Sequence, residues 1–274
     1  MSVREREKVK REIARIFRER VRGMRYCEFE TREHCGSEGH WLESRFNIRP
    51  NSRKDADYKG FELKVDSPKV SVGDYTADEY LYSQAAHGLR RINGDRHLYM
   101  EKTEFIRTFG YPNDSKGGRF GWTGRASPKY NVWNDCGQCL VLCPQSHNLY
   151  VVYSHRRDRR VTREAMPDAF KTGYVAIVMW RGATLRENIE RKWNRNGFFM
   201  VRKDKKGAGG TYEEVVFGRP FDYDYFVEGV MKGHVVFDSG MVENSSRARN
   251  CSKFRVVNAW RGPFLSSLFE DRVT

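Results

Sequence analysis

The segment Asp57-Tyr58-Lys59-Gly60-Phe61-Glu62-Leu63-Lys64 carries the most specific structural signal in this chain of 274 residues. The pair Lys59-Gly60 indicates a tight turn, and the residues that follow predict a strand. Side chains two residues apart on a strand point to the same face, so Glu62 and Lys64 share a face while Leu63 points into a core. We expect the turn to bring the carboxylate of Asp57 back beside Glu62.

This arrangement predicts a cation site next to an amine that acts on water. Carboxylate oxygens are ligands that Mg²⁺ prefers, so we expect Asp57 and Glu62 to hold Mg²⁺, with Mn²⁺ as a substitute, and we include the backbone carbonyl of Leu63 as a third ligand. The ion would contact a phosphate oxygen and lower the pKa of a bound water, which Lys64 would orient or deprotonate. A surface hairpin with alternating charges gives the same string of residues, so the pattern alone leaves that alternative open.

Residues on the N-terminal side of this segment carry a family resemblance. A short helix is predicted over residues 40–46, after Gly36-Ser37-Glu38-Gly39, and the run Gly39-His40-Trp41-Leu42-Glu43 precedes Asn51 and Asp57. This order resembles the MutH/MvaI/BcnI family of restriction-like endonucleases, a MutH-like branch of the PD-(D/E)XK superfamily. In that family a Gly-x-x-(Leu)-Glu helix precedes an Asn, an Asp and a Gly-x-Glu-Leu-Lys strand.

The resemblance implies a role for each matching residue. Glu43 would be the glutamate on the helix of the active site, Asp57 the first metal ligand, Glu62 the second and Lys64 the catalytic lysine. The spacing from the Asp to the Glu is similar to that of the MvaI/BcnI branch, whereas MutH has a longer gap. One departure is that Lys54-Asp55-Ala56 precedes Asp57, where the family often has Pro or another small residue.

A fainter resemblance covers residues 109–113 and 120–124 and a basic run near the C-terminus. In the family, the C-terminal run lies on the side that reads DNA. Arginine can bind guanine and asparagine can bind adenine with two hydrogen bonds each, while lysine holds phosphates. A solvated loop is the alternative reading of the run. The residues that we expect to contact DNA are His234, Asp238, Arg247, Arg249, Asn250, Lys253 and Arg255.

The resemblance also implies a fold and a biological setting. We expect an α/β (α+β) protein with a restriction-endonuclease-like mixed β-sheet flanked by helices, in which two lobes form a DNA-binding cleft. Residues 1–165 would form the catalytic lobe and residues 166–274 the recognition lobe, with the two lobes free to interleave. The partners would be double-stranded DNA and a separately encoded cognate methyltransferase, and the enzyme would act as a monomer.

Periodicity outlines the remaining elements. Apolar residues at helical spacing predict helices over residues 4–22, 183–194 and 222–232, and a further helix is expected near residues 77–90. A hairpin is predicted from strands 138–143 and 148–153, followed by a basic loop over 155–160. The other predicted strands are residues 175–180, 198–202, 213–217 and 235–237.

Composition agrees with a polyanion as the partner. The formal net charge is +14 and the sequence pI is about 9.6, values typical of proteins that bind nucleic acid, although a solubilising surface gives the same balance. We find no stretch long enough to span a membrane and no signal peptide, and therefore expect a cytoplasmic protein. The six cysteines are expected to be free thiols, and a zinc site that includes Cys136 and Cys139 is the weaker alternative.

The sequence leaves three functions in competition. The leading one is a type II restriction endonuclease that cuts both strands of a short duplex site and leaves 5′-phosphate ends. The second is a strand-specific nicking endonuclease similar to MutH, and the third is a non-catalytic DNA-binding protein. Similarity to MvaI favours a short, GC-flanked pseudo-palindrome such as CCNGG as the target.

Overall fold

A computed structural model describes residues 2–26, 37–49, 55–94, 98–204, 210–243 and 252–274. The chain forms two compact units: unit 1 comprises Met1–Val70, Glu187–Val227 and Val256–Thr274, and unit 2 comprises Ser71–Arg186 and Glu228–Arg255. The sequence predicts a division near residue 165 with lobes free to interleave, and the chain passes between these two units four times. The physical reason is strand pairing, since strands from distant segments complete one sheet in unit 1.

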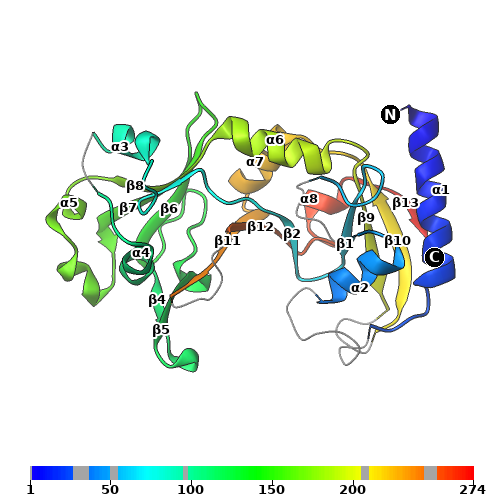
Figure 1. Cartoon of the computed structure of the whole chain (residues 1–274), viewed down its shortest axis with the longest axis horizontal. Helices are drawn as coiled ribbons and strands as arrows, with labels where there is room; N and C mark the ends of the chain where they lie inside the picture. Colours follow the sequence, from blue (N-terminus) through cyan, green and yellow to red (C-terminus); the bar gives the residue numbers. More distant parts are fainter. Residues whose placement is uncertain (1, 27–36, 50–54, 95–97, 205–209, 244–251) are drawn as a thin grey trace. The chain divides into compact units, whose positions relative to one another are not determined.

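The sheet of unit 1 places the predicted strand of the sequence motif at its edge. Its order is β1-β9-β10-β13, with β1 parallel to β9 and the remaining pairs antiparallel (Figure 1). Its strands are β1 (Glu62–Val65), β9 (Phe198–Lys203), β10 (Tyr212–Gly218) and β13 (Phe269–Val273). A mixed sheet of this kind, flanked by helices, confirms the expected α/β (α+β) class.

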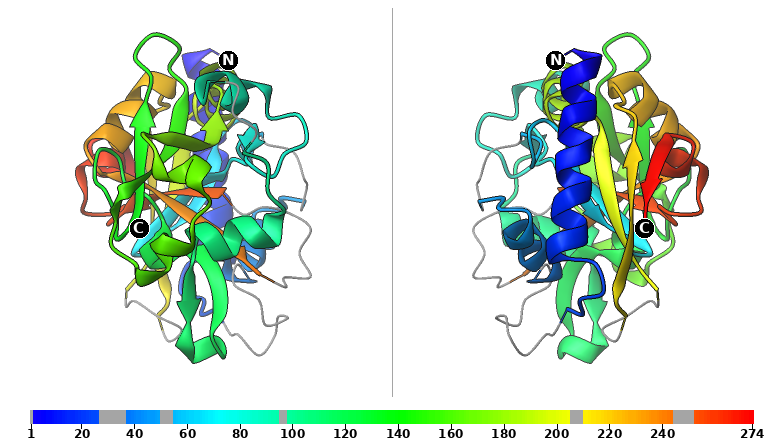
Figure 2. Two further views of the ribbon diagram at one scale, coloured as in Figure 1. Left: turned by 90° about the vertical axis from the view of Figure 1, so that its left-hand side faces the viewer. Right: turned by 90° about the vertical axis from the view of Figure 1, so that its right-hand side faces the viewer.

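Two helices, α1 (Val3–Arg20) and α2 (Ser37–Arg45), cover one face of this sheet. A capping box between Ser2 and Glu5 starts α1, which lies where the sequence predicts a helix over residues 4–22. Its buried stripe packs with Leu63 of β1 and with the apolar residues of β9 and β10 in one core. Figure 2 shows α1, in blue, lying along the yellow strands of this sheet.

The opposite face of the sheet carries the functional side chains. Glu62 and Lys64 alternate with Leu63, so they lie on the face that α1 and α2 leave uncovered. On the same face as Glu62 lies Phe198 of β9, which packs edge-on against Trp193 with ring centroids 5.7 Å apart. The last turn of α6 (Gly182–Trp193) therefore lies beside the two predicted active-site residues.

Unit 2 contains two further sheets, ordered β2-β12-β11-β5-β4 and β3-β8-β7-β6. The first is formed by β2 (Lys69–Asp74), β12 (Ser252–Val257), β11 (Val235–Val242), β5 (Arg119–Thr123) and β4 (Tyr111–Asn113). The second is formed by β3 (Glu79–Tyr80), β8 (Val175–Trp180), β7 (Leu149–Asp158) and β6 (Cys136–Leu142).

The remaining helices of the described residues are divided between the two units. They are α3 (His87–Ile92), α4 (Lys102–Phe109), α5 (Asp168–Lys171), α7 (Tyr223–Met231) and α8 (Pro263–Ser266), with short 3-10 turns at Asp114–Lys116, Gly124–Ala126 and Val161–Ala165. None of the helices in the described residues is both long and apolar enough to cross a membrane.

Two predictions about local structure in unit 2 are wrong. The helix expected near residues 77–90 is instead the short strand β3 followed by α3. Glu79 is buried on β3 and accepts hydrogen bonds from the backbone N–H groups of Gly88 and Leu89, so it caps the start of α3 instead of continuing a helix. The basic loop expected over residues 155–160 is largely strand, because β7 extends to Asp158.

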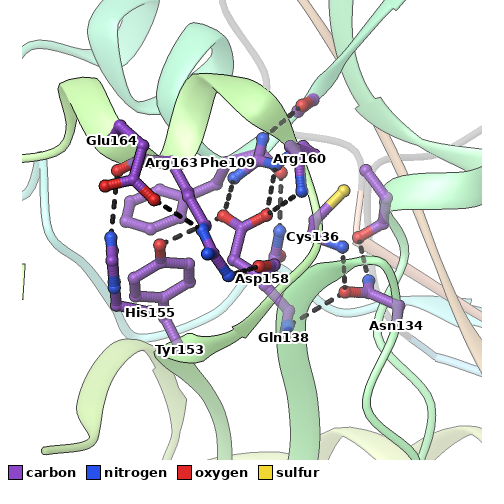
Figure 3. Close-up of polar contacts among 12 residues, drawn as sticks. Phe109, Asn134, Cys136, Gln138, Tyr153, His155, Asp158, Arg160, Arg163 and Glu164 are labelled. Carbon is purple, nitrogen blue, oxygen red and sulfur yellow. Dashed lines mark hydrogen bonds and ion pairs between the residues drawn. The ribbon is translucent and has the colours of Figure 1, made fainter. Parts of the chain in front are cut away.

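Asp158 ends β7 inside a buried polar network (Figure 3). Its carboxylate accepts hydrogen bonds from Arg160 Nε at 2.9 Å, Arg160 Nη2 at 2.6 Å and the Tyr153 hydroxyl at 3.1 Å. Arg160 in turn donates to the carbonyl oxygen of Gly110 at 2.9 Å. Asp158 is fully buried and the Arg160 side chain is 8% exposed, so each charge depends on the other for its compensation.

Asp158→Asn is expected to destabilise the protein by about 3 kcal/mol, because it leaves the buried guanidinium of Arg160 without a counter-charge. Urea unfolding at neutral pH measures the loss. Asp168→Asn is the matched control, since the Asp168 side chain is 96% exposed and pairs with Lys171 within its own helix. Equal, small losses in both variants would contradict a stabilising role for the buried pair.

Candidate active site

A tight turn lies between the two acidic residues of the sequence motif, Asp57 and Glu62. The backbone N–H of Tyr58 donates to the Phe61 carbonyl and the N–H of Phe61 donates to the Tyr58 carbonyl, both at 2.8 Å. The two central residues have positive φ angles, 46° at Lys59 and 87° at Gly60. This is the geometry of a type I′ turn, in which glycine at the second central position avoids backbone strain.

Asn196, which follows α6, clamps this turn. Its side-chain Nδ2 donates to the Lys59 carbonyl at 2.7 Å, and its backbone N–H donates to the Gly60 carbonyl at 3.0 Å. A Cβ atom at Gly60 would lie 2.6 Å from Asn196 Nδ2, so the close approach of the clamp requires glycine. The turn before β1 is therefore fixed by a residue more than a hundred positions later in the chain.

The turn places Asp57 beside the edge of β1 that faces away from β9. Asp57 Oδ2 accepts a hydrogen bond from the backbone N–H of Leu63 at 2.9 Å. The N–H groups of Glu62 and Asp66 point the other way, to Gly197 and Val201 along β9. Because the N–H and C=O of one strand residue face the same edge, the carbonyl of Leu63 lies on the side of Asp57.

Glu62 is the buried centre of the cluster. It is 1% exposed, and its Oε1 lies 2.5 Å from Lys64 Nζ and 2.8 Å from Lys192 Nζ. Its second oxygen, Oε2, is buried and has no hydrogen-bond partner among the described residues. A buried carboxylate oxygen without a donor is costly, so this atom marks a place for a ligand.

Burial and like charge shape the electrostatics of the pair of acids. Burial raises the pKa of Asp57 to about 7, and the neighbouring charge of Glu62 adds to this effect, while Lys64 and Lys192 oppose it. Burial acts to lower the pKa of Lys192, but the charges of Glu62 and Asp57 outweigh it, so this pKa is raised and the ammonium stays protonated. The cluster therefore combines two acids with two cations in a small volume.

Lys192 and Trp193 are the site residues that the sequence analysis missed. Both lie in the last turn of α6, and the ammonium of Lys64 lies 5.3 Å from the centroid of the Trp193 ring. The sequence does hold a signal: Leu185 and Ile189 form the apolar stripe of this helix, and Lys192 falls on the next turn of that stripe. A lysine at a position where the pattern calls for an apolar residue needs a buried partner.

Glu43 is the fourth site residue expected from the family resemblance. It lies in α2, which packs against β1, and its Oε2 lies 3.0 Å from His40 Nδ1. Its negative charge contributes to the raised pKa of Lys192, so the two side chains are electrostatic neighbours. The structure thus brings Asp57, Glu62 and Lys64 together, and Glu43 is linked to them by its electrostatic effect on Lys192.

The donor set fits a hard divalent cation. The carboxylate of Asp57, the free Oε2 of Glu62 and the Leu63 carbonyl are oxygen donors of the kind that Mg²⁺ prefers. The described residues contain no cluster of three or more Asp, Glu, His or Cys side chains that could hold a metal. A cation here would consequently need the main-chain carbonyl and water to complete its ligands.

The residues expected to read DNA are only partly described. Arg247, Arg249 and Asn250 lie outside the described residues. Asp238 of β11 and Arg255 of β12 lie on the less buried face of their sheet in unit 2 and form an ion pair with 2.6 Å between Arg255 Nε and Asp238 Oδ2. Further residues on or near these strands are the half-buried Lys253 and His234.

The cysteines of the weaker zinc alternative lie in β6. Cys136 and Cys139 are buried free thiols, and burial raises the pKa of each. A raised pKa disfavours the thiolate form that binds zinc. Cys27, Cys35 and Cys251 lie outside the described residues.

Comparisons with known proteins agree on one family. The profile of a family described as LlaMI restriction endonuclease matches residues 22–264. The type II restriction enzyme ScrFI of Lactococcus lactis subsp. cremoris is 33% identical over 266 residues, covering 92% of this chain and 95% of that enzyme. The structure of restriction endonuclease MvaI in complex with its cognate DNA substrate superposes with a TM-score of 0.61 at 10% identity, covering 95% of this chain and 96% of MvaI. At that identity the likeness to MvaI shows the fold.

The raised pKa of Asp57 predicts that binding of a divalent cation depends on pH. Below about pH 7 the carboxyl group carries a proton that the cation must displace, so affinity for Ca²⁺ falls by up to about tenfold per pH unit, and it levels off above that pH. Calorimetric titration of the DNA-free protein with Ca²⁺ across this range checks the prediction. Asp57→Asn should weaken binding and remove the dependence, whereas Asp55→Asn should keep both; the reverse pattern would contradict the assignment.

Proposed function

Because this chain belongs to the LlaMI restriction endonuclease family, we propose that it hydrolyses both strands of duplex DNA at a short specific sequence with the aid of Mg²⁺. Membership confirms the resemblance to MvaI-type restriction endonucleases and makes the chain a site-specific deoxyribonuclease. The observation that carries the proposal is the convergence of Asp57, Glu62 and Lys64, with one buried carboxylate oxygen left without a donor.

The residues that would hold the ion are Asp57, Glu62 through Oε2, and Leu63 through its carbonyl. The bound cation would offset charge on the scissile phosphate and lower the pKa of a water, and Mn²⁺ would substitute for Mg²⁺. Lys64 would orient that water and offset the negative charge that develops on the phosphoryl oxygens. The Trp193 ring beside the Lys64 ammonium limits where this side chain can point.

The proposed reaction is hydrolysis of the bond between phosphorus and the 3′ oxygen. The water oxygen forms a bond to phosphorus, the bond from phosphorus to the 3′ oxygen breaks, and the released 3′ oxygen takes up a proton. The products are a 5′-phosphate and a 3′-hydroxyl. In this scheme Lys64 acts on the water and does not contact the bases, whereas Glu43 acts through Lys192 and contributes charge to the cluster.

Unit 2 would supply the recognition of the sequence. Asp238 and Arg255 lie on one face of their sheet, where the guanidinium can bind guanine O6 and N7 and the carboxylate can accept from cytosine N4. His234, Lys253, Arg247, Arg249 and Asn250 would complete the contacts. We propose a short GC-flanked target, action as a monomer and a separately encoded methyltransferase that protects host DNA.

Lys64→Ala is expected to lower the rate of cleavage at least about a hundredfold while leaving specific DNA binding unchanged, since the residue acts on the water. Digestion of plasmid and phage DNA with Mg²⁺, followed by sequencing of the fragment ends, measures the rate and reveals the target. Lys232→Ala is the control, because this exposed lysine pairs only with Glu228. Cleavage by Lys64→Ala at the normal rate would exclude the proposed role.

The same digestion separates the competing functions. Linear plasmid as the final product supports a restriction endonuclease, whereas accumulation of nicked circles without linear DNA would indicate a nicking enzyme like MutH. Specific binding without cleavage in any divalent cation would indicate a non-catalytic DNA-binding protein.

Arg255→Ala is expected to weaken binding to the target sequence by about tenfold to a hundredfold and to change binding to other DNA much less, because a base contact is lost. Fluorescence anisotropy in Ca²⁺ with target and scrambled duplexes checks this. Arg15→Ala is the control, since this exposed arginine pairs with Glu19 on α1. Equal losses on both duplexes would identify Arg255 as a phosphate contact instead.

A further inference from the structure

We propose that Lys192 is a positioning residue of the nuclease site: it holds Glu62 by Oε1, so that Oε2 stays available to the cation and Lys64 is free to act on the water. The proposal rests on the proposed function, in which Lys64 serves the attacking water. It gives a task to a buried cation that neither the sequence motif nor the family resemblance includes.

The contacts of Glu62 support this positioning role for Lys192. Both Lys64 and Lys192 donate to Oε1, at 2.5 Å and 2.8 Å, while Oε2 has no donor among the described residues. A buried carboxylate oxygen needs at least one donor. With Lys192 in place, Oε1 keeps its donor when Lys64 turns toward a water, so movement of Lys64 leaves no uncompensated oxygen behind.

The balance of charge between the two carboxylates and the two lysines also supports this role. Asp57 and Glu62 repel each other, and two ammonium groups offset them before any cation or DNA is present. If Lys64 alone neutralised Glu62, it would be both the counter-ion of a buried acid and the group that serves the water. Lys192 separates these two tasks, since it still neutralises Glu62 through Oε1 when Lys64 turns toward the water.

The position of Lys192 at the end of α6 further supports this role. Its side chain is 19% exposed and extends from the apolar stripe of α6, directly before the fully buried Trp193. Asn196, a few residues later, clamps the turn between Asp57 and Glu62. The end of α6 thus fixes Lys192 relative to both carboxylates, which favours a positioning role over a contact with a flexible DNA backbone.

Calorimetric titration with Ca²⁺, without DNA, tests the charge balance. In Lys192→Met, loss of a cation beside Glu62 removes repulsion of the metal, so the affinity for Ca²⁺ should rise by about tenfold. The melting temperature of the metal-free protein should fall, and Ca²⁺ should raise it by more than it does in the wild type. A lysine that only packs would lower the melting temperature equally with and without Ca²⁺, and that result would overturn the proposal.

Matched variants sharpen the comparison. Arg191→Met removes a positive charge one position earlier on α6, where the side chain pairs with Glu187, and it should change Ca²⁺ affinity less than about twofold. Lys192→Arg keeps the charge and should keep Ca²⁺ affinity within about threefold of the wild type. A rise in affinity of the same size in Arg191→Met would show that only the overall charge matters, and would also overturn the proposal.

Cleavage kinetics test the effect on Lys64. Lys192→Met should lower kcat by about tenfold to a hundredfold with KM and DNA affinity within about twofold of the wild type, because Lys64 is then retained by Glu62. Unchanged kcat with weaker DNA binding would make Lys192 a phosphate contact and contradict the proposal. Failure of the proposed function is distinguishable, since the wild type would then not cleave at all while the Ca²⁺ titrations still report on Lys192.

Discussion

Two carboxylates placed beside each other, one of them buried, impose the central constraint on this protein. Burial raises the pKa of Asp57, and the neighbouring charge of Glu62 raises it further because the two carboxylates repel one another. Glu62 is tolerated only because two ammonium groups contact its Oε1. The remaining oxygen has no donor, so the cluster is balanced in charge and still incomplete as a set of hydrogen bonds.

The fold meets this constraint by bringing two distant segments of the chain together. The segment from Asp57 through β1 supplies the two acids and Lys64, and the end of α6 with the residues that follow supplies Lys192, Trp193 and Asn196. Parallel pairing of β1 with β9 joins the segments in one sheet. Most of unit 2 lies between these two segments in the sequence, so the site depends on strand pairing across a long insertion.

The sequence alone was sufficient for the half of the site that lies within one short segment. Alternation along a strand and a Lys-Gly turn predict the neighbourhood of Asp57, Glu62 and Lys64, because these relations are local. Lys192 depends on a contact across the unit 2 insertion, which no local pattern expresses; its one trace is a lysine on an apolar stripe. The helix expected near residues 77–90 failed for a related reason, since burial of Glu79 as a cap for α3 is a contact that periodicity cannot show.

Anomalous diffraction from crystals of the protein grown with Mn²⁺ tests most directly whether Asp57 and Glu62 together bind a divalent cation. We expect one strong peak bounded by the Asp57 carboxylate, Glu62 Oε2 and the Leu63 carbonyl, with Lys192 still on Glu62 Oε1. A peak elsewhere in the molecule, with both oxygens of Glu62 turned away from Asp57, would contradict it.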